Sequence, residues 1–249
     1  LEFRRVLFRS RKVLIATPAY DGRLDVWYTN SLVNTIRIAQ ANGVFVHPVF
    51  MSYDALIQRA RNDLFGLAVE GEYDDMIFID SDMEWAPEWI MELLARSEDV
   101  VGGTARKKTD DAEIYVAKTT DLTVHENGLI KCEGLGTGFV KLSRKAFITL
   151  WDSSVEYQNE GKTRRMICDV QVVDGQLYSE DTVLFKKLNE QGFDIVFDGR
   201  DLSGLGVVLG FMVESNYRRS LLISGGDPSI FISDRVSLLL LALAAALTD

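Results

Sequence analysis

Short apolar runs alternate with amphipathic stretches over the first half of the chain, and this alternation limits the possible folds more than any other feature. Four apolar runs are predicted to be strands, at residues 12–17, 44–50, 75–80 and 99–102. Three stretches with helical spacing separate them, at residues 26–42, 54–70 and 87–95. Because such strands are joined by right-handed crossovers, we predict an α/β fold with a Rossmann-type, mostly parallel sheet flanked by helices.

The second half of the chain has a mixed pattern. Predicted strands at residues 113–118 and 129–133 flank Asn127-Gly128, a dipeptide typical of hairpin turns. Further elements are predicted as a strand at residues 138–142, a helix beginning at Ser143, a helix at residues 179–191 and a strand at residues 194–197. No linker or repeat interrupts this order, so we expect one continuous domain over residues 11–200, with a smaller mixed region in its second part.

Both ends of the sequence differ from this domain. Residues 1–10 carry one Glu and three Arg and resemble a translated sequencing adapter, so we treat them as a non-native leader. Residues 201–249 form an uncertain tail that includes a run of Leu and Ala at residues 238–247. That run is shorter than the roughly 20 residues that cross a bilayer, so we expect no transmembrane span. A packed helix, a weak membrane contact and frameshifted sequence all stay open for it.

Composition narrows the classes of partner. The formal net charge of -10 argues against nucleic acid, which is bound through clustered Lys and Arg. The 47% of hydrophobic residues is enough for a substantial core. The two cysteines, Cys132 and Cys168, have no CxxC spacing, so we interpret them as free structural thiols in a reducing compartment and expect a cytoplasmic protein.

Two aspartates follow the third predicted strand. Asp80-Ser81-Asp82 places two carboxylates, one residue apart, where an apolar strand ends. Ligands of open α/β sheets bind outside the carboxyl ends of the strands, and Thr17-Pro18 and Gly102-Gly103 are predicted at the same edge. Carboxylates are the ligands that hard divalent cations prefer, and a diphosphate can complete their shell. Most Asp-x-Asp tripeptides are solvated turns, but this position favours a metal site.

Three other passages carry possible chemistry. Arg59 and Arg61 lie two apart on a predicted helix and so do not share a face; one could pair with a diphosphate or the carboxylates, although a solvated helix face explains both. The Gly-rich residues 133–139 permit close approach of the backbone to a ligand, or form a bulged strand. Glu180 and Asp181 open a helix, where the helix dipole alone favours acids, and either could act as a general base.

Together these passages resemble the GT-A glycosyltransferases, especially the small family-2-like enzymes of phages and bacteria. The motifs that carry the resemblance, in order, are residues 15–20, 57–62, 78–83, 101–103, 136–139, 179–185 and 192–194. Their order and spacing are more specific than any one of them, and they cover residues 12–200. The resemblance implies a metal-dependent enzyme that transfers a sugar from a nucleotide-diphosphate sugar, with residues 11–104 as the nucleotide-sugar half and residues 105–200 as the acceptor half.

The resemblance also implies roles for individual residues. On the donor side, the implied contacts are Thr17, Pro18, Tyr20, Arg59, Asn62, Asp80 and Gly103. Asp80 and Asp82 would hold Mn²⁺ or Mg²⁺ with the diphosphate of a UDP- or GDP-sugar, Asp82 most directly.

On the acceptor side, Gly136, Thr137 and Gly138 would shape the site for a carbohydrate or glycoconjugate. Glu180 and Asp181 match an acidic pair near the acceptor, with Asp181 as the candidate catalytic base.

One departure from the family pattern bears on the metal. The family often carries a His-x-Gly after the last strand, but residues 198–206 contain no His, and Gly204 stands in its place. A nucleotide-sugar-binding relic without catalysis therefore stays an alternative. A HAD-like phosphatase is a second alternative, since it also uses an Asp-x-Asp after a strand. It is weaker here because Met83-Glu84 follows the motif and two strand–helix units precede it.

Overall fold

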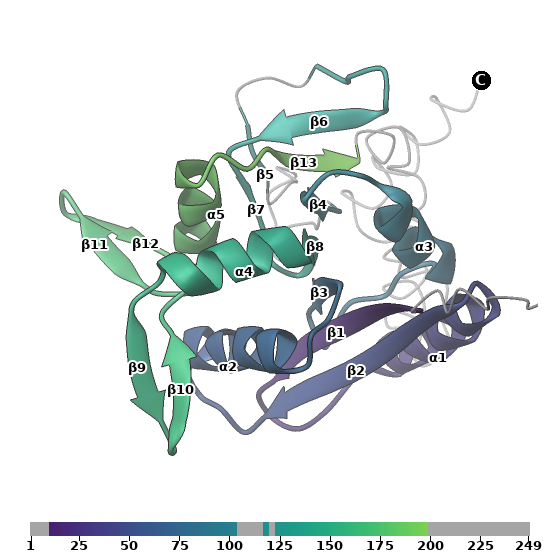
Figure 1. Ribbon diagram of the computed structural model, residues 1–249, viewed down its shortest axis with the longest axis horizontal. Helices are drawn as coiled ribbons and strands as arrows, with labels where there is room; N and C mark the ends of the chain where they lie inside the picture. Colours follow the sequence, from purple (N-terminus) through teal and green to yellow (C-terminus); the bar gives the residue numbers. More distant parts are fainter. Residues whose placement is uncertain (1–9, 104–116, 120–122, 199–249) are drawn as a thin grey trace, which may run out of the picture. The chain divides into compact units, whose positions relative to one another are not determined.

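A computed structural model describes residues 10–103, 117–119 and 123–198, which all belong to a compact unit spanning Leu1–Gly199. The predicted leader, apart from Ser10, lies outside the described residues, and so does the tail at residues 201–249. Of residues 198–206, where the family often carries a His, only Asp198 is described. The central sheet consists of β1 (Arg11–Ala19), β2 (Val44–Ser52), β3 (Asp75–Ile79), β4 (Val100–Gly102), β6 (Leu129–Cys132), β8 (Phe139–Ser143) and β13 (Ile195–Asp198). Its strand order is β2-β1-β3-β8-β4-β13-β6 (Figure 1).

The directions of these strands confirm an α/β fold with a mixed sheet. β1 is parallel to β2 and β3, and β4 is parallel to β13. β8 is antiparallel to β3 and β4, and β6 is antiparallel to β13, so five of the seven strands share one direction. The predicted parallel half is not continuous, because β8 from the second half of the chain lies between β3 and β4. Both halves of the predicted domain therefore build one sheet.

Helices cover both faces of the sheet. They are α1 (Val26–Ala41), α2 (Ile57–Glu70), α3 (Pro87–Ala95), α4 (Arg144–Ser153) and α5 (Glu180–Glu190). α1 packs with α3 on one face, and α2, α4 and α5 lie on the other (Figure 1). Among the residues that the structure describes, no helix is both long and apolar enough to cross a membrane.

The helix ends follow local hydrogen bonding. α4 begins one residue after the predicted start at Ser143, and Ser143 caps it, since its side chain accepts a hydrogen bond from the Ala146 amide. The second helix is predicted to begin at residue 54, but α2 begins at Ile57, so Asp54 does not cap it. The Asp54 carboxylate accepts hydrogen bonds from the Leu56 amide and the Arg59 side chain instead, which forms a separate turn before the helix.

A core of buried aromatic and aliphatic side chains lies between the sheet and helices α1 and α3. Tyr28 and Trp85 are buried with their ring centroids 4.9 Å apart in an edge-to-face arrangement. The Trp85 indole donates a 2.9 Å hydrogen bond to Thr35, so its polar nitrogen is satisfied inside the core. Val13 and Ile15 of β1 belong to the same buried cluster, which ties the first strand to this face.

The strands of the mixed region pair differently from the prediction. β5 (Ala117–Lys118) pairs with β7 (Gly134–Leu135), just beyond the predicted partner strand at residues 129–133, and β6 pairs with β13. The Glu133 amide donates a 2.7 Å hydrogen bond to the Lys118 carbonyl, so the described end of the predicted hairpin forms with its partner shifted along the chain. Asn127-Gly128 does form a turn, with Gly128 at φ 79°. The strand after that turn continues the central sheet because its apolar residues Leu129 and Ile130 are buried there.

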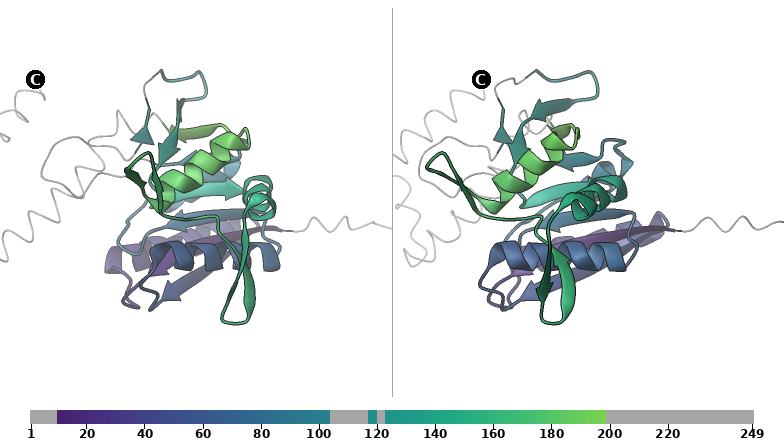
Figure 2. Two further views of the ribbon diagram at one scale, coloured as in Figure 1. Left: turned by 90° about the vertical axis from the view of Figure 1, so that its left-hand side faces the viewer. Right: turned by 60° about the vertical axis from the view of Figure 1, so that its left-hand side comes forward.

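Two small hairpins occupy a stretch for which no strand is predicted. β9 (Glu156–Asn159) pairs with β10 (Lys162–Arg165), and β11 (Gln171–Val173) pairs with β12 (Gln176–Tyr178). Figure 2 shows both hairpins outside the central sheet, the first beside α2 and the second leading into α5. Each turn has two residues with positive φ, Glu160-Gly161 and Asp174-Gly175, the backbone that two-residue hairpin turns require.

Candidate functional site

A cavity of about 340 Å³ lies at the carboxyl ends of β1, β2 and β3. Its lining residues are Pro18, Ala19, Tyr20, Met51, Asp54, Ala55, Ile57, Ala60, Arg61, Asp80, Ser81 and Asp82. Four of the residues predicted for the donor and metal sites therefore line one cavity: Pro18, Tyr20, Asp80 and Asp82. Its volume falls within the range of small-molecule sites, about 300–1,000 Å³.

The end of β3 places Asp80 at the floor of this cavity. The Asp80 amide donates a 3.0 Å hydrogen bond to the Gly138 carbonyl, and the Met83 amide donates to the Asp80 carbonyl at 3.1 Å, which closes the turn. A Cβ atom at Gly138 would stand 3.0 Å from Asp80 Oδ2, so any other residue there would crowd the carboxylate. Asp80 is half-buried and Asp82 is exposed, which leaves the second carboxylate on the solvent side.

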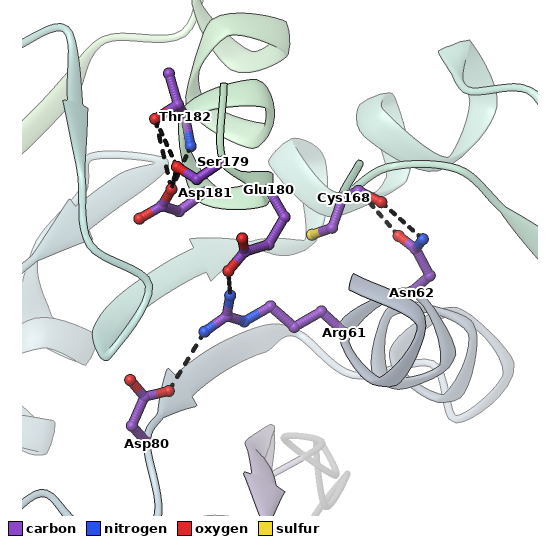
Figure 3. Close-up of polar contacts among 8 residues, drawn as sticks. All are labelled: Arg61, Asn62, Asp80, Cys168, Ser179, Glu180, Asp181 and Thr182. Carbon is purple, nitrogen blue, oxygen red and sulfur yellow. Dashed lines mark hydrogen bonds and ion pairs between the residues drawn. The ribbon is translucent and has the colours of Figure 1, made fainter. Parts of the chain in front are cut away.

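Arg61 reaches the same carboxylate from α2. Its side chain is 6% exposed and forms an ion pair with Glu180 at the start of α5. Its other terminal nitrogen lies 3.4 Å from Asp80 Oδ1 (Figure 3). Nε of Arg61 is buried without a hydrogen-bond partner, so the two terminal nitrogens make the contacts with these carboxylates. Of the two arginines that the sequence could not separate, Arg61 is the one that faces the cavity.

Arg59 points to a different carboxylate. Its guanidinium donates two hydrogen bonds to Asp54, at 2.8 and 2.7 Å, and 43% of its side chain is exposed. These hydrogen bonds hold the pKa of the Asp54 carboxyl below its usual value, so Asp54 stays ionised at the cavity wall. Arg59 is therefore not among the residues that line the cavity, as predicted for a donor contact, and it contacts Asp54, which does line the cavity.

Asn62 lies in the core, outside the cavity lining. Its Oδ1 accepts hydrogen bonds from the amides of Ile167 and Cys168, at 3.1 and 2.7 Å, and its Nδ2 donates to the Cys168 carbonyl at 2.9 Å. Lys187 of α5 donates to the Ile167 carbonyl at 2.9 Å. These contacts hold the segment at residues 166–168 between α2 and α5, so the structure gives Asn62 a positioning role and does not support a direct donor contact.

Two other predicted donor residues are engaged within the fold. Thr17 is fully buried, and its hydroxyl shares a hydrogen bond with Tyr28. Burial raises the pKa of Tyr28 to about 12, so this pair is neutral and does not present charge to the cavity. Gly103 packs against Phe139, since a Cβ atom there would meet that ring at 3.0 Å.

The predicted acceptor residues divide into two groups. Gly138 contacts Asp80 directly, whereas Thr137 is buried and Gly136 is half-buried beside it. Glu180 turns toward Arg61, while Asp181 accepts hydrogen bonds from the Ser179 hydroxyl and from the Thr182 amide (Figure 3).

The two acids at the start of α5 therefore differ in their partners. Glu180 is joined to the cavity floor through Arg61, and the contacts of Asp181 stay within its own first turn.

The carboxylates at the floor fit a cation that takes part of its shell from a ligand. Asp80 and Asp82 supply hard oxygen donors, and the glycine at 138 leaves room beside Asp80. No group of three or more His, Cys, Asp or Glu that could hold a metal occurs within residues 10–103, 117–119 and 123–198. Magnesium and manganese sites often keep waters and phosphate oxygens as ligands, so two carboxylates are a sufficient protein contribution.

Two parts of the site were missed by reasoning from sequence. Asp54 lines the cavity, and the signal for it is its position directly after a strand whose carboxyl end lies beside that of β1. The pairing of Arg61 with Glu180 joins residues far apart in the chain, so local pattern does not predict it.

Comparison with known proteins gives little further constraint. No protein-family model matches the chain, and no curated protein matches it. Among solved structures it is similar to the "Crystal Structure of A197 from STIV", with 16% sequence identity, a TM-score of 0.47, and coverage of 75% of this chain and 81% of that chain. A likeness at this level carries no argument about function.

Proposed function

We propose that this chain is a metal-dependent glycosyltransferase that moves a sugar from a UDP- or GDP-sugar to a carbohydrate or glycoconjugate acceptor. The observation that carries the proposal is the single cavity in which Pro18, Tyr20, Asp80 and Asp82 meet. These residues come from separate motifs of the chain, and their predicted roles are in binding one donor. The net charge of -10 is consistent with a small anion held locally and not with nucleic acid.

Each wall of the cavity has a role in this proposal. Tyr20 is 68% exposed beside Pro18, which offers an aromatic surface for the nucleoside. Asp54 stays ionised and, although both of its oxygens already accept hydrogen bonds from Arg59, it would accept one more from the nucleoside. Asp80 and Asp82 would hold a divalent cation, which neutralises charge that develops on a leaving diphosphate.

On the acceptor side, an acid of the α5 first turn would take the proton from the attacking hydroxyl. Asp181 is our candidate because Glu180 is engaged by Arg61. The hydrogen bonds that Asp181 accepts from Ser179 and Thr182 fix the direction of its carboxylate.

A nucleotide-sugar-binding protein without catalysis would use the same cavity. It differs from the proposed glycosyltransferase only in lacking turnover. The phosphatase alternative stays weaker for two reasons: two strand–helix units, β1–α1 and β2–α2, precede the motif, and Met83-Glu84 follows it. We therefore keep the binding relic as the second candidate.

Binding is tested by thermal shift with nucleoside diphosphates and nucleotide sugars, each with and without Mn²⁺. A ligand at 100 times its Kd stabilises the folded state by about 2.7 kcal/mol. For a chain of this size, that corresponds to a rise in Tm of roughly 5–10 °C. Asp82→Ala should lose the Mn²⁺-dependent part of the shift. Asp152→Ala, which removes another exposed carboxylate, on α4, should keep it.

If no nucleotide or nucleotide sugar changes Tm with Mn²⁺ present, the proposed donor class is wrong. If the shift survives in Asp82→Ala, the cation role of that residue is wrong.

A further inference from the structure

One guanidinium joins the donor end of the site to its acceptor end. Arg61 is 6% exposed and lies between Asp80, which follows β3, and Glu180, which opens α5 (Figure 3). A fixed fork of N–H donors can hold two carboxylates at once, which a lysine ammonium does not reproduce. Arg61 therefore links Glu180 to Asp80 at the cavity.

The surroundings of Arg61 keep this fork in place. It follows Ala60 on a helix whose buried face also carries Leu64 and Phe65, so its stem is packed. The next residue, Asn62, holds the segment at residues 166–168, which passes between α2 and α5. Two consecutive residues of α2 thus connect it to the acceptor part of the fold.

Arg61 contacts the carboxylate that would also hold the proposed divalent cation. The guanidinium nitrogen lies 3.4 Å from Asp80 Oδ1, and 41% of the Asp80 side chain is exposed. A cation bound at Asp80 and Asp82 would lie close to a fixed positive charge, which opposes its binding. Glu180 offsets part of that charge, because it forms the second ion pair of the same guanidinium.

We propose that Arg61 is a positioning residue that couples Glu180 to the cation site: the Arg61–Glu180 pair draws the guanidinium away from Asp80 and so makes Asp80 available to the cation. The inference rests on the proposed function only for the identity of the cation site. It predicts that the two partners of the pair act on cation affinity in opposite directions.

The test is a double-mutant cycle on Mn²⁺ affinity, measured by electron paramagnetic resonance of free Mn²⁺ without nucleotide or turnover. Arg61→Gln removes the competing charge and should tighten Mn²⁺ binding about tenfold. Glu180→Gln leaves Arg61 with Asp80 alone and should weaken binding about threefold. In the double variant, Glu180→Gln should have almost no further effect, since the residue through which it acts is gone.

Arg37→Gln is the matched control, because it removes the same charge from an exposed position on α1 and should leave Mn²⁺ affinity unchanged. Thermal melting of every variant shows whether it is folded. Arg61→Lys keeps the positive charge but loses the guanidinium geometry. In that background, as in Arg61→Gln, the further change Glu180→Gln should have almost no effect on Mn²⁺ affinity.

The outcomes separate this inference from the proposed function. If Glu180→Gln weakens Mn²⁺ binding equally with Arg61 present and absent, the coupling is wrong, while nucleotide-sugar binding can still stand. If the cycle is non-additive as described but no nucleotide sugar binds, the coupling stands and the proposed function is wrong. A wild-type chain that binds no Mn²⁺ without nucleotide overturns the coupling, and the proposed function is then decided by the thermal-shift test with nucleotide present.

Discussion

The contact between Gly138 and Asp80 makes a test of the cation site that leaves every charge in place. A Cβ atom at Gly138 would stand 3.0 Å from Asp80 Oδ2, so in Gly138→Ala the carboxylate must move by a few tenths of an ångström. Metal–oxygen distances tolerate only about 0.2 Å, so this shift is large enough to disturb a ligand. We expect Mn²⁺ affinity to fall about tenfold, the size of effect that residues supporting metal ligands usually have.

The assay is Mn²⁺ titration together with thermal melting. Gly134→Ala is the control, because its Cβ atom would crowd Phe185 Cβ at 3.2 Å, away from the cavity. Neither glycine has a positive φ, so alanine strains neither backbone. If Gly138→Ala binds Mn²⁺ within about twofold of wild type, Asp80 is not a ligand. If Gly134→Ala weakens Mn²⁺ binding to the same extent, the effect is general crowding and the reasoning fails.

Two predictions concern the fold that supports the site. Asn62→Ala removes three hydrogen bonds to Ile167 and Cys168 and should lower the free energy of unfolding by about 2–4 kcal/mol; a loss below about 1 kcal/mol in urea unfolding would contradict the positioning role. Burial raises the pKa of Tyr28 from its ordinary value of 10.0 to about 12 in the folded state, so the folded state keeps a proton that the unfolded state has lost. Stability should therefore fall as pH rises from 10 to 12, by about 2–3 kcal/mol from this residue. Tyr28→Phe should show a shallower decline than wild type, and identical slopes would refute the assignment.

The first half of the fold was predictable because its elements are local. The helix at Pro87–Ala95 has both predicted ends, since Pro87 fits the first turn and the pattern is regular. The insertion of β8 between β3 and β4 was not predictable, because strand order depends on contacts between distant residues. Lys141 on β8 is buried in the sheet and donates to the Arg96 carbonyl, which no local pattern indicates.

The hairpins of the mixed region left a signal that was overlooked. Asp174-Gly175 is a dipeptide typical of two-residue turns, and it joins β11 to β12. The flanking strands are short, and their residues Val172 and Leu177 are mostly exposed, so they lack the alternation by which half-buried strands are recognised.

The site itself was predicted in part. Pro18, Tyr20, Asp80 and Asp82 meet at the carboxyl edge because parallel strands end there together. The inward direction of Arg61 could have been derived from its spacing to Leu64 and Phe65, which places it on the buried stripe of α2. Its partner Glu180 depends on the packing of α5 against the rest of the fold, which the sequence does not specify locally.

The most direct test of the proposed function is release of sugar from nucleotide-sugar donors by the purified chain, with Mn²⁺ and with the metal removed by a chelator. We predict that at least one UDP- or GDP-sugar is hydrolysed or transferred with Mn²⁺, that chelation stops this, and that Asp82→Ala abolishes it while Asp152→Ala does not. Turnover that is unchanged in Asp82→Ala would contradict the metal role. Tight Mn²⁺-dependent binding without turnover on any donor and acceptor would show that the chain only binds its nucleotide sugar.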